Sequence, residues 1–570
     1  TLNEDGSIDY RYQHELDLYS YYAFNRLYGE TFIVYNPDHQ TLKINESVTT
    51  MEDGTEVPSP ENAFNEVLPF MASGAPPYSH LREMVVTHTG LEKNSTIKLD
   101  YELKSEKGFI PFLMGDEVLS QSSPVKELVI KVIIPENTEL NYKLLHAEED
   151  LNIARKGKIK EYEWTFKDLP VNERERNQPE FNTHLPRLVF STTNLKKAYN
   201  SIKDQLSYDL PGAISSSIKD IVSDKDSELE KILAIQDKVV HQMNHFRVPL
   251  EYKGYQLHSN EKVLENNGGT TEEKTILLAS LLKEIGINAQ PVVIVPSEYF
   301  DEKIGNLKFY EKYLVKVAHN KEDIYLSAIT DNKYSADYKF PSEKVLLIDK
   351  EKDEPEITSW QENISKAKYE GTFELTSDFH LKGQLESHIS CCENPYLSII
   401  TDEKSVSRLL NPGFPASSVK KSETITMTPA SSEINYTIDK ELTKNEQGDY
   451  LFIDIPYVST GLDHWHLGNL PAERETPMEL DYPLNVDYNY TISKPGNMKL
   501  VTGNIEVTEE NEIGKLSISI GLQDDNIVIQ KSLNINQTVI QPEKYVYFYE
   551  LMTKWNKDNY KTLVLKMSSE

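Results

Sequence analysis

The residues best placed for chemistry lie in one short segment, Gly269–Lys274, which reads GTTEEK and precedes a leucine-rich stretch. Thr270 and Glu273 have the types and spacing of a capping box, so we expect a helix to begin at Thr271. The first N–H groups of a helix stabilise a nearby anion, which suits a nucleophile. Thr271 supplies only a hydroxyl, which is far harder to ionise than a thiol with a pKa of about 8.5. Attack by Thr271 would therefore need a strong base beside it.

The elements around this segment follow from the spacing of apolar residues. Residues 194–206, 213–222 and 227–246 have helical character, and Ser227 with Glu230 forms a second capping box. The helix that begins at Thr271 is expected to reach residue 285 and to end before Gly286. Its buried stripe would be Leu277, Leu278, Leu281, Leu282 and Ile285. Strands are expected next at 291–295, 313–317 and 323–326, so this part of the chain has the order of an α+β domain with an antiparallel sheet.

The rest of the chain has the alternation of β-structure. Segments rich in Val, Ile, Tyr and Thr, separated by turn signals, predict a β-sandwich before about residue 185. Beyond about residue 355 helical patterns disappear, and alternating segments such as 434–439 and 515–520 predict a second sandwich-like domain. We therefore expect a multidomain α+β protein with boundaries at 1–185, 186–350 and 351–570.

Composition excludes some classes of function. The 570 residues carry 91 acidic and 60 basic side chains, a net charge of -31, which argues against nucleic acid and anionic membranes as partners. No apolar run approaches the roughly 18 to 20 residues that span a bilayer. The chain begins without Met, which is consistent with prior removal of a targeting segment.

Other chemistry-bearing residues give weaker signals. The two cysteines, Cys391 and Cys392, are adjacent and too close for an ordinary disulfide, so they are interpreted as ordinary thiols. The run 463–466 reads DHWH, but two histidines without a third ligand are a weak zinc signal and favour a turn or sheet surface. Tyr78 and Arg82 are interpreted as structural. Gly268 and Gly269 lack the Lys-Ser/Thr ending of a phosphate loop. No cofactor or metal is expected.

The middle of the chain resembles the transglutaminase-like domain of the papain-type superfamily. The shared sequence pattern is Gly-x-Cys-x-x-Lys, then a leucine-rich helix, then Gly-Ile-x-Ala. In this chain the first part corresponds to Gly269–Lys274 and the last to Gly286-Ile287-Asn288-Ala289. The flanks also resemble exported proteins, chiefly of the Bacteroidetes, in which β-domains of unknown function precede and follow this core. The fits are Tyr35-Asn36-Pro37, Asp53-Gly54 and residues 90–101 in the first domain, and residues 472–477, AERETP, in the last.

The resemblance implies three catalytic positions, and all three are altered. In active members a Cys opens the helix, a His lies on the next strand and an Asp ends the strand after it. The Cys position falls on Thr271, the His position on Lys312 and the Asp position on Ser327. His319 is a conceivable substitute base, although its surroundings are typical of a turn between strands.

We therefore expect a pseudo-transglutaminase that acts by binding or scaffolding, with a peptide, a glycan or an envelope protein as ligand. The resemblance also implies export to the periplasm or cell surface. Two alternatives stay open. The protein could be an atypical hydrolase that uses a Thr271–Lys312 dyad, if Lys312 is buried with a lowered pKa. It could also be a structural spacer whose former cleft is filled.

Overall fold

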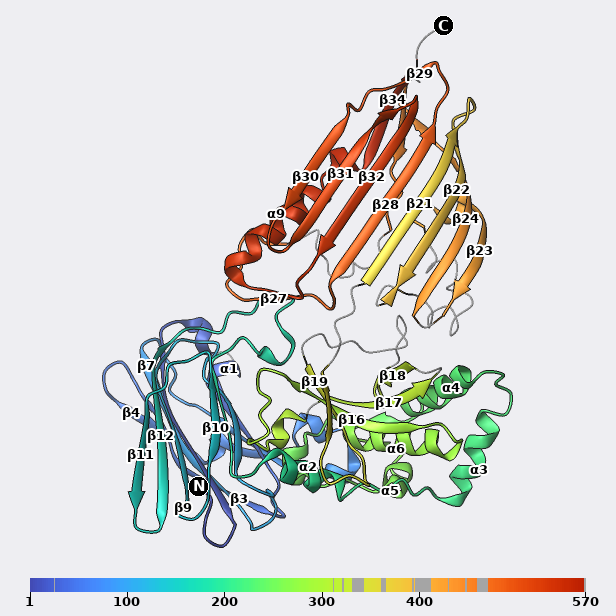
Figure 1. Ribbon diagram of the computed structural model, residues 1–570. Helices are drawn as coiled ribbons and strands as arrows, with labels where there is room; N and C mark the ends of the chain where they lie inside the picture. Colours follow the sequence, from blue (N-terminus) through green and yellow to red (C-terminus); the bar gives the residue numbers. More distant parts are fainter. Residues whose placement is uncertain are drawn as a thin grey trace. The chain divides into compact units, whose positions relative to one another are not determined.

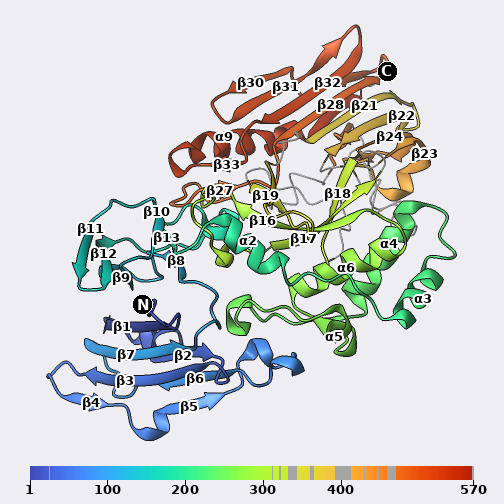
Figure 2. The same ribbon diagram turned by 60° about the horizontal axis from the view of Figure 1, so that its bottom comes forward.

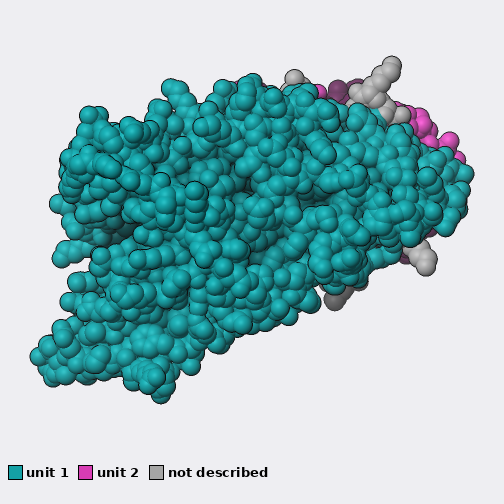
Figure 3. All heavy atoms as spheres, turned by 90° about the horizontal axis from the view of Figure 1, so that it is seen from below, with its two compact units in different colours: residues 1–172, 185–331, 344–358 teal, residues 173–184, 332–343, 359–570 magenta. Residues whose placement is uncertain are grey.

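The computed structural model divides the chain into two compact units (Figure 1). The first contains residues 1–172, 185–331 and 344–358, and the second contains 173–184, 332–343 and 359–570; Figure 3 colours them separately. The structure describes residues 1–24, 26–310, 312–319, 322–330, 343–359, 365–391, 394, 412–428, 430–445, 449–458 and 470–567.

The chain begins with two small antiparallel sheets in the first unit. One has the order β1-β7-β3-β4 and the other β2-β6-β5. Their bounds are β1 (Ile8–Leu18), β2 (Glu30–Tyr35), β3 (Gln40–Thr50), β4 (Glu56–Pro58), β5 (Phe64–Val67), β6 (Arg82–Thr87) and β7 (Ser95–Ser105), with a short α1 (Arg26–Gly29) before β2. Ile33, Val86 and Leu99 are buried together, so the two sheets share an apolar core.

Two further antiparallel sheets of this unit have the orders β10-β13-β8 and β11-β12-β9. Their bounds are β8 (Met114–Val118), β9 (Val125–Pro135), β10 (Asn141–Leu145), β11 (Leu151–Lys156), β12 (Ile159–Leu169) and β13 (Arg187–Ser191). Trp164 is fully buried in their core with Ile134 and Leu188. Among the segments rich in Val, Ile, Tyr and Thr, residues 31–35, 96–101 and 128–134 all lie within observed strands.

A helical segment follows, and four of its five helices begin at polar caps. The Asn194 side chain accepts from the Lys197 N–H at the start of α2, and Ser227 and Glu230 form the predicted capping box of α4. The helices are α2 (Leu195–Lys203), α3 (Gly212–Ile221), α4 (Glu228–His241), α5 (Asn260–Glu265) and α6 (Thr271–Glu284).

The predicted helix over 227–246 is too long by five residues. The helix α4 ends at His241, with Gln242 as its C-cap, and Asn244 and His245 form the short strand β14. The Asn244 and Phe246 N–H groups donate to the carbonyls of Asn267 and Gly269, both at 2.9 Å. Backbone pairing with β15 (Gly268–Gly269) thus replaces the last helical turn.

The helix α6 packs against a five-stranded sheet of order β18-β17-β16-β19-β20 (Figure 2). Its strands are β16 (Ala289–Pro296), β17 (Lys312–His319), β18 (Glu322–Leu326), β19 (Glu343–Leu347) and β20 (Glu356–Ser359). β16, β17 and β18 pair antiparallel, as predicted. The predicted leucines of α6 are at most 1% exposed, whereas Ile285 is the half-buried C-cap. Burial on nearly every side fixes the helix start relative to the sheet.

The second unit contains an eight-stranded sheet of order β23-β24-β22-β21-β28-β32-β31-β30, in which β21 and β28 run parallel. The strands are β21 (Ser365–Leu375), β22 (His380–Ser390), β23 (Val419–Met427), β24 (Ser431–Glu441), β28 (Leu484–Ser493), β30 (Ile505–Glu510), β31 (Gly514–Gln523) and β32 (Asn526–Ile535). Smaller sheets join β25 (Thr443–Lys444), β26 (Tyr450–Asp454), β29 (Met498–Leu500) and β34 (Thr562–Met567), and β27 (Met478–Glu479) with β33 (Val539–Ile540).

Helices do not disappear after residue 355, contrary to the sequence prediction. α9 (Tyr545–Trp555) buries Tyr545, Phe548, Leu551, Met552 and Trp555 in the core of the second unit. The spacing of three and four was visible in the sequence, but aromatic residues of high strand propensity supply it. The protein as a whole is multidomain and mostly β. None of the helices among the described residues is long and apolar enough to cross a membrane.

The AERETP segment has a structural role inside the second unit. Arg474 is buried and its Nε lies 3.8 Å from the Glu175 carboxylate. That carboxylate also accepts from the Thr476 N–H at 2.8 Å. A charged pair therefore fastens the segment around residue 175 to the C-terminal part of the chain.

Candidate functional site

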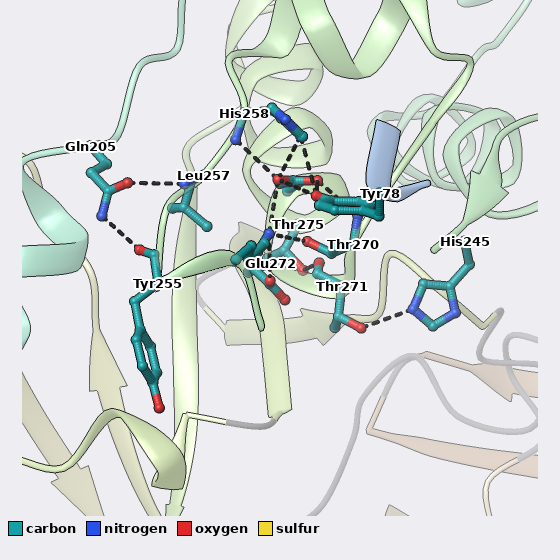
Figure 4. Close-up of polar contacts among 12 residues, drawn as sticks. Tyr78, Gln205, His245, Tyr255, Leu257, His258, Thr270, Thr271, Glu272 and Thr275 are labelled. Carbon is teal, nitrogen blue, oxygen red and sulfur yellow. Dashed lines mark hydrogen bonds and ion pairs between the residues drawn. The ribbon is translucent and has the colours of Figure 1, made fainter. Parts of the chain in front are cut away.

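Thr271 is the first residue of α6, and its hydroxyl lies against an imidazole. The Thr271 Oγ1 is hydrogen-bonded to the His245 Nε2 at 3.0 Å (Figure 4). The parallel pairing of β14 with β15 creates this contact, because it sets His245 opposite Gly269, two residues before Thr271. Both side chains are half-buried. The hydroxyl and imidazole therefore have the relative position of a nucleophile and a general base.

Gly268 permits the close approach of the two strands. A Cβ at this position would lie 2.7 Å from the Phe246 ring and 2.8 Å from the Asn244 carbonyl oxygen. A larger residue would force the strands apart and move His245 away from the helix start. The glycine pair that did not fit a phosphate loop is thus explained by packing.

Burial, together with nearby positive charges, keeps the imidazole of His245 neutral. Burial, followed by the nearby cations Lys274 and Arg247, lowers the pKa of His245 to about 4. Lys274 is itself fully buried, its Nζ donates to the Met243 carbonyl at 3.1 Å, and burial lowers its pKa to about 8. A neutral imidazole can accept a proton from the hydroxyl. The same cations, however, destabilise the imidazolium that such a transfer would create.

A second polar cluster surrounds Glu273, whose side chain is fully buried. Its carboxylate accepts from the Lys253 Nζ at 2.9 Å, from the backbone N–H groups of Thr270 at 2.9 Å and His258 at 3.0 Å, and from the Tyr78 hydroxyl at 3.2 Å. Burial pushes the pKa of Glu273 upward, but the bonds from His258, Lys253 and Thr270 outweigh it, so the pKa lies well below its usual range. The predicted contact between Glu273 and the N-cap backbone is confirmed.

The cluster joins three parts of the first unit around the start of α6. Lys253 also contacts the Thr270 Oγ1 at 2.9 Å and the Glu272 carboxylate at 3.0 Å. Tyr78 comes from the segment between β5 and β6, and burial together with the carboxylates of Glu273 and Glu272 raises its pKa well above the usual range. In Figure 4, Tyr78 and His258 converge from one side of the helix start while Thr271 points to His245. This arrangement holds the helix start rigidly.

Lys312 and Ser327, the residues assigned to the His and Asp positions, belong to β17 and to the turn after β18. Lys312 is the first residue of β17 and lies opposite Ile294 of β16. Ser327 follows β18 and is buried; its hydroxyl accepts from the N–H groups of Ile329 and Thr330 at 3.1 and 3.2 Å. Ser327 thus stabilises a turn, and the hydroxyl of Thr271 pairs with His245, which the sequence prediction did not include. His245 was assigned to a helix, so its position gave no signal.

The remaining sequence candidates have structural surroundings. His319 ends β17, and its Nδ1 lies 2.9 Å from the Glu228 carboxylate, which is the first residue of α4. Arg82 donates to the carbonyls of residues 79, 80 and 81 at 3.0, 3.2 and 2.8 Å. Cys391 follows β22 and is half-buried. Cys392 and the DHWH run at 463–466 lie outside the described residues.

A pocket adjoins the Glu273 cluster on the side of the N-terminal sheets. It has a volume of about 610 Å³, and its walls come from three chain segments, 36–39, 77–80 and 106–109, together with residues 253–258. His39 and Phe109 stack in this wall with ring centroids 5.0 Å apart. Tyr78, Lys253 and His258 belong both to the pocket wall and to the cluster. A ligand in the pocket would therefore contact the residues that hold the start of α6.

Comparison with known proteins gives two matches to domain families. Residues 4–172 match the family described as a domain of unknown function with a solved structure, DUF3857, and residues 450–565 match a second such family, DUF3858. The predicted β-domains of unknown function on both flanks are thereby confirmed for these residues. No curated protein matches the chain.

Two solved structures are similar to the chain to very different degrees. A protein of Parabacteroides distasonis, described as a "putative protease", is 27% identical, with a TM-score of 0.72, over 99% of this chain and 97% of its own. A "putative cysteine protease" of Cytophaga hutchinsonii is 9% identical, with a TM-score of 0.17, over 56% of this chain and 78% of its own. This similarity is too low to indicate a shared fold. The chain is thus similar, over nearly its whole length, to a protein described as a "putative protease", and residues 4–172 and 450–565 match the families DUF3857 and DUF3858.

Proposed function

We propose that the protein is a non-catalytic relative of transglutaminase-like proteases and that it binds an extended peptide segment. The main support is the electrostatic environment of His245, which is hydrogen-bonded to Thr271. The imidazole has a pKa of about 4 and faces cations where a working base would face an anion. We infer that the chain has kept the fold of such proteases but has lost a working catalytic base.

The free energies involved support loss of catalysis. The N-terminus of a helix stabilises an anion by roughly 0.3–1 kcal/mol, which shifts a pKa by less than one unit. A threonine hydroxyl therefore depends on its base. In nucleophile–base sites a carboxylate orients the imidazole and stabilises its protonated form. Within the part of the chain that the structure describes, His245 bonds to the Thr271 hydroxyl and lies near the cations Lys274 and Arg247, which act in the opposite sense.

The 610 Å³ pocket beside the Glu273 cluster is the proposed place for the peptide. Its wall combines the stacked rings of His39 and Phe109 with the polar groups of Tyr78 and His258. Such a mixture of flat apolar surface and fixed polar groups suits a peptide backbone with one anchored side chain. The similar protein described as a protease supports a peptide as the class of ligand.

A second candidate function is hydrolysis by Thr271 with His245 as base. The observation that favours it is the hydrogen bond of 3.0 Å between the two side chains. The Thr271–Lys312 dyad stays a separate alternative, and the hydrogen bond makes the Thr271–His245 pair the arrangement to be tested first.

Hydrolysis assays separate the two functions. The wild type, Thr271→Ala and His245→Ala would be incubated with a panel of peptides and activated esters, with product formation followed by mass spectrometry. We expect the three proteins to be indistinguishable from buffer. Turnover by the wild type that both substitutions abolish would establish the hydrolase and overturn our proposal.

Peptide binding is tested separately with a fluorescent library of extended peptides. Binding measured by anisotropy should be weakened by His39→Ala and Phe109→Ala, which shorten the pocket wall, and unchanged by Tyr21→Ala, a control on an exposed tyrosine of the same unit. Equal affinity for all four proteins would exclude this pocket as the peptide site.

A further inference from the structure

The solvent-facing side of the eight-stranded sheet carries a group of side chains typical of a metal site. Glu386 and His388 are two residues apart on β22, so they lie on the same face of the sheet. Glu433 of β24 is the direct cross-strand partner of His388. From this arrangement we infer that Glu386, His388 and Glu433 bind a divalent cation of the zinc class.

The three side chains lie close enough to share one ion, because one ligand atom from each residue lies within 4.8 Å of the other two. As they stand, the carboxylates lie beside different ring nitrogens of His388: the Glu386 Oε1 is 2.9 Å from Nε2, and the Glu433 Oε2 is 3.9 Å from Nδ1. A zinc ion needs ligand atoms at about 2.0 to 2.2 Å, so binding requires one nitrogen and both carboxylates to turn toward a common point. All three side chains are between 35% and 42% exposed, so solvent can deliver the ion.

The local charge favours a cation at the centre of the group. Two carboxylates face one imidazole, and a neutral imidazole has a single N–H to donate. A dication between the three residues would neutralise both carboxylates at once. Lys368 of β21 is the cross-strand partner of His388. Its Nζ lies 2.8 Å from the Glu370 carboxylate, and its charge also acts on Glu386, so it offsets only part of the negative charge of the group.

One of the three proposed ligands, Glu386, also lines a second pocket, from which an exchangeable ligand could reach the ion. This pocket, of about 450 Å³, is lined by Glu386 and by its cross-strand partner Asn435. Polar side chains of neighbouring strands, Gln384, Glu370, Asn489 and Gln530, line it as well. Three protein ligands with one position open to a polar pocket is the arrangement of zinc sites that bind an exchangeable water or another oxygen ligand. The site is independent of the peptide pocket in the first unit.

The same two strands offer a matched control. His380 of β22 lies 2.6 Å from the Asp439 carboxylate of β24, also with side chains about 30% exposed. This pair has one carboxylate and one imidazole. Because two protein ligands hold zinc weakly, His380→Ala should leave metal binding unchanged.

The test is titration of the chelator-treated full chain with Zn²⁺, Mn²⁺ and Ca²⁺ by calorimetry, with folding of every variant checked by circular dichroism. We expect one equivalent of Zn²⁺ to bind more tightly than Mn²⁺ or Ca²⁺, because the site includes an imidazole. Glu386→Gln, His388→Ala and Glu433→Gln should each weaken this binding roughly tenfold or more, since a lost ligand costs at least as much as a lost outer-shell partner.

The outcomes decide clearly. The site would be established if Glu386→Gln, His388→Ala and Glu433→Gln each lose the bound equivalent of Zn²⁺ while His380→Ala retains it. Unchanged Zn²⁺ affinity and stoichiometry in His388→Ala, or an equal loss in His380→Ala, would overturn it. A preference for Ca²⁺ over Zn²⁺ would also contradict the assigned class of ion.

Discussion

Removal of the positive charge at Lys253 should destabilise the first unit strongly. The Lys253 side chain is 6% exposed and pairs with Glu272 and Glu273, which are 7% and 0% exposed. Lys253→Met keeps most of the volume of the side chain but leaves two neighbouring carboxylates buried without their cation. Removing one partner of a buried ion pair costs about 3–5 kcal/mol. We expect the free energy of unfolding to fall by an amount in this range.

Urea unfolding at pH 7, with hydrogen exchange measured on the amides of α6, gives the free energy for the relevant part of the chain. Lys262→Met is the control, because the Lys262–Glu265 pair is solvent-exposed and should contribute at most about 1 kcal/mol. Adding Glu273→Gln to Lys253→Met should restore part of the loss, because one of the two uncompensated carboxylates is then neutral. If Lys253→Met costs no more than Lys262→Met, the cluster does not hold the helix start and our reasoning is wrong.

The effect of Lys253→Met should also depend on pH. The pKa of Glu273 in the folded protein lies well below its usual range. Its ionised form therefore contributes stability that is present above the unfolded pKa of about 4.3 and is lost as the pH falls further. The difference between wild type and Lys253→Met should be largest at neutral pH and should shrink in acid. A difference that grows in acid would contradict the assigned charge state.

Three further predictions concern the helix starts. Thr271→Cys should produce a thiol that iodoacetamide alkylates faster than the native cysteines, as measured by mass spectrometry. The same variant should not hydrolyse peptides, and turnover would show that the site still supports catalysis. In the wild type, the free energy of unfolding should fall between about pH 6.5 and pH 4, because the unfolded chain takes up a proton at His245 in that window and the folded protein, with a pKa of about 4, does not. His245→Gln should reduce this fall. An unchanged pH profile in urea titrations would refute the lowered pKa. Ser227→Ala should cost about 1 kcal/mol in the same titrations, since it removes the cap of α4, and a change near zero would mean that the cap contributes nothing.

Much of the architecture around the site follows from local sequence patterns. The helix α6 was predicted within one residue, because its leucines repeat every three or four positions and Glu273 caps it. The strands β16, β17 and β18 were predicted because short β-rich runs alternate with turn signals. The missed helix α9 shows the limit of such patterns, since aromatic residues fit a strand as well as a buried helix face.

The partner of Thr271 could not be predicted from local patterns. The apolar repeat of α4 continues to Met243 and Phe246, so helix periodicity included His245. The chain leaves the helix because β14 pairs with β15, more than 20 residues later, and such pairing has no local signal. The positions assigned to Lys312 and Ser327 by resemblance stay predictions; the structure places Lys312 at the start of β17 and Ser327 in a turn after β18.

The sequence by itself determined that Thr271, a weak nucleophile, opens a buried helix, because caps and apolar repeats act over a few residues. Only the tertiary structure decided what surrounds that hydroxyl. His245, Lys253 and Tyr78 reach the start of α6 from three separate segments. Burial and nearby charges then shift the pKa values of His245 and Tyr78. Electrostatic effects depend on distance in space and on exclusion of water, and chain folding fixes both.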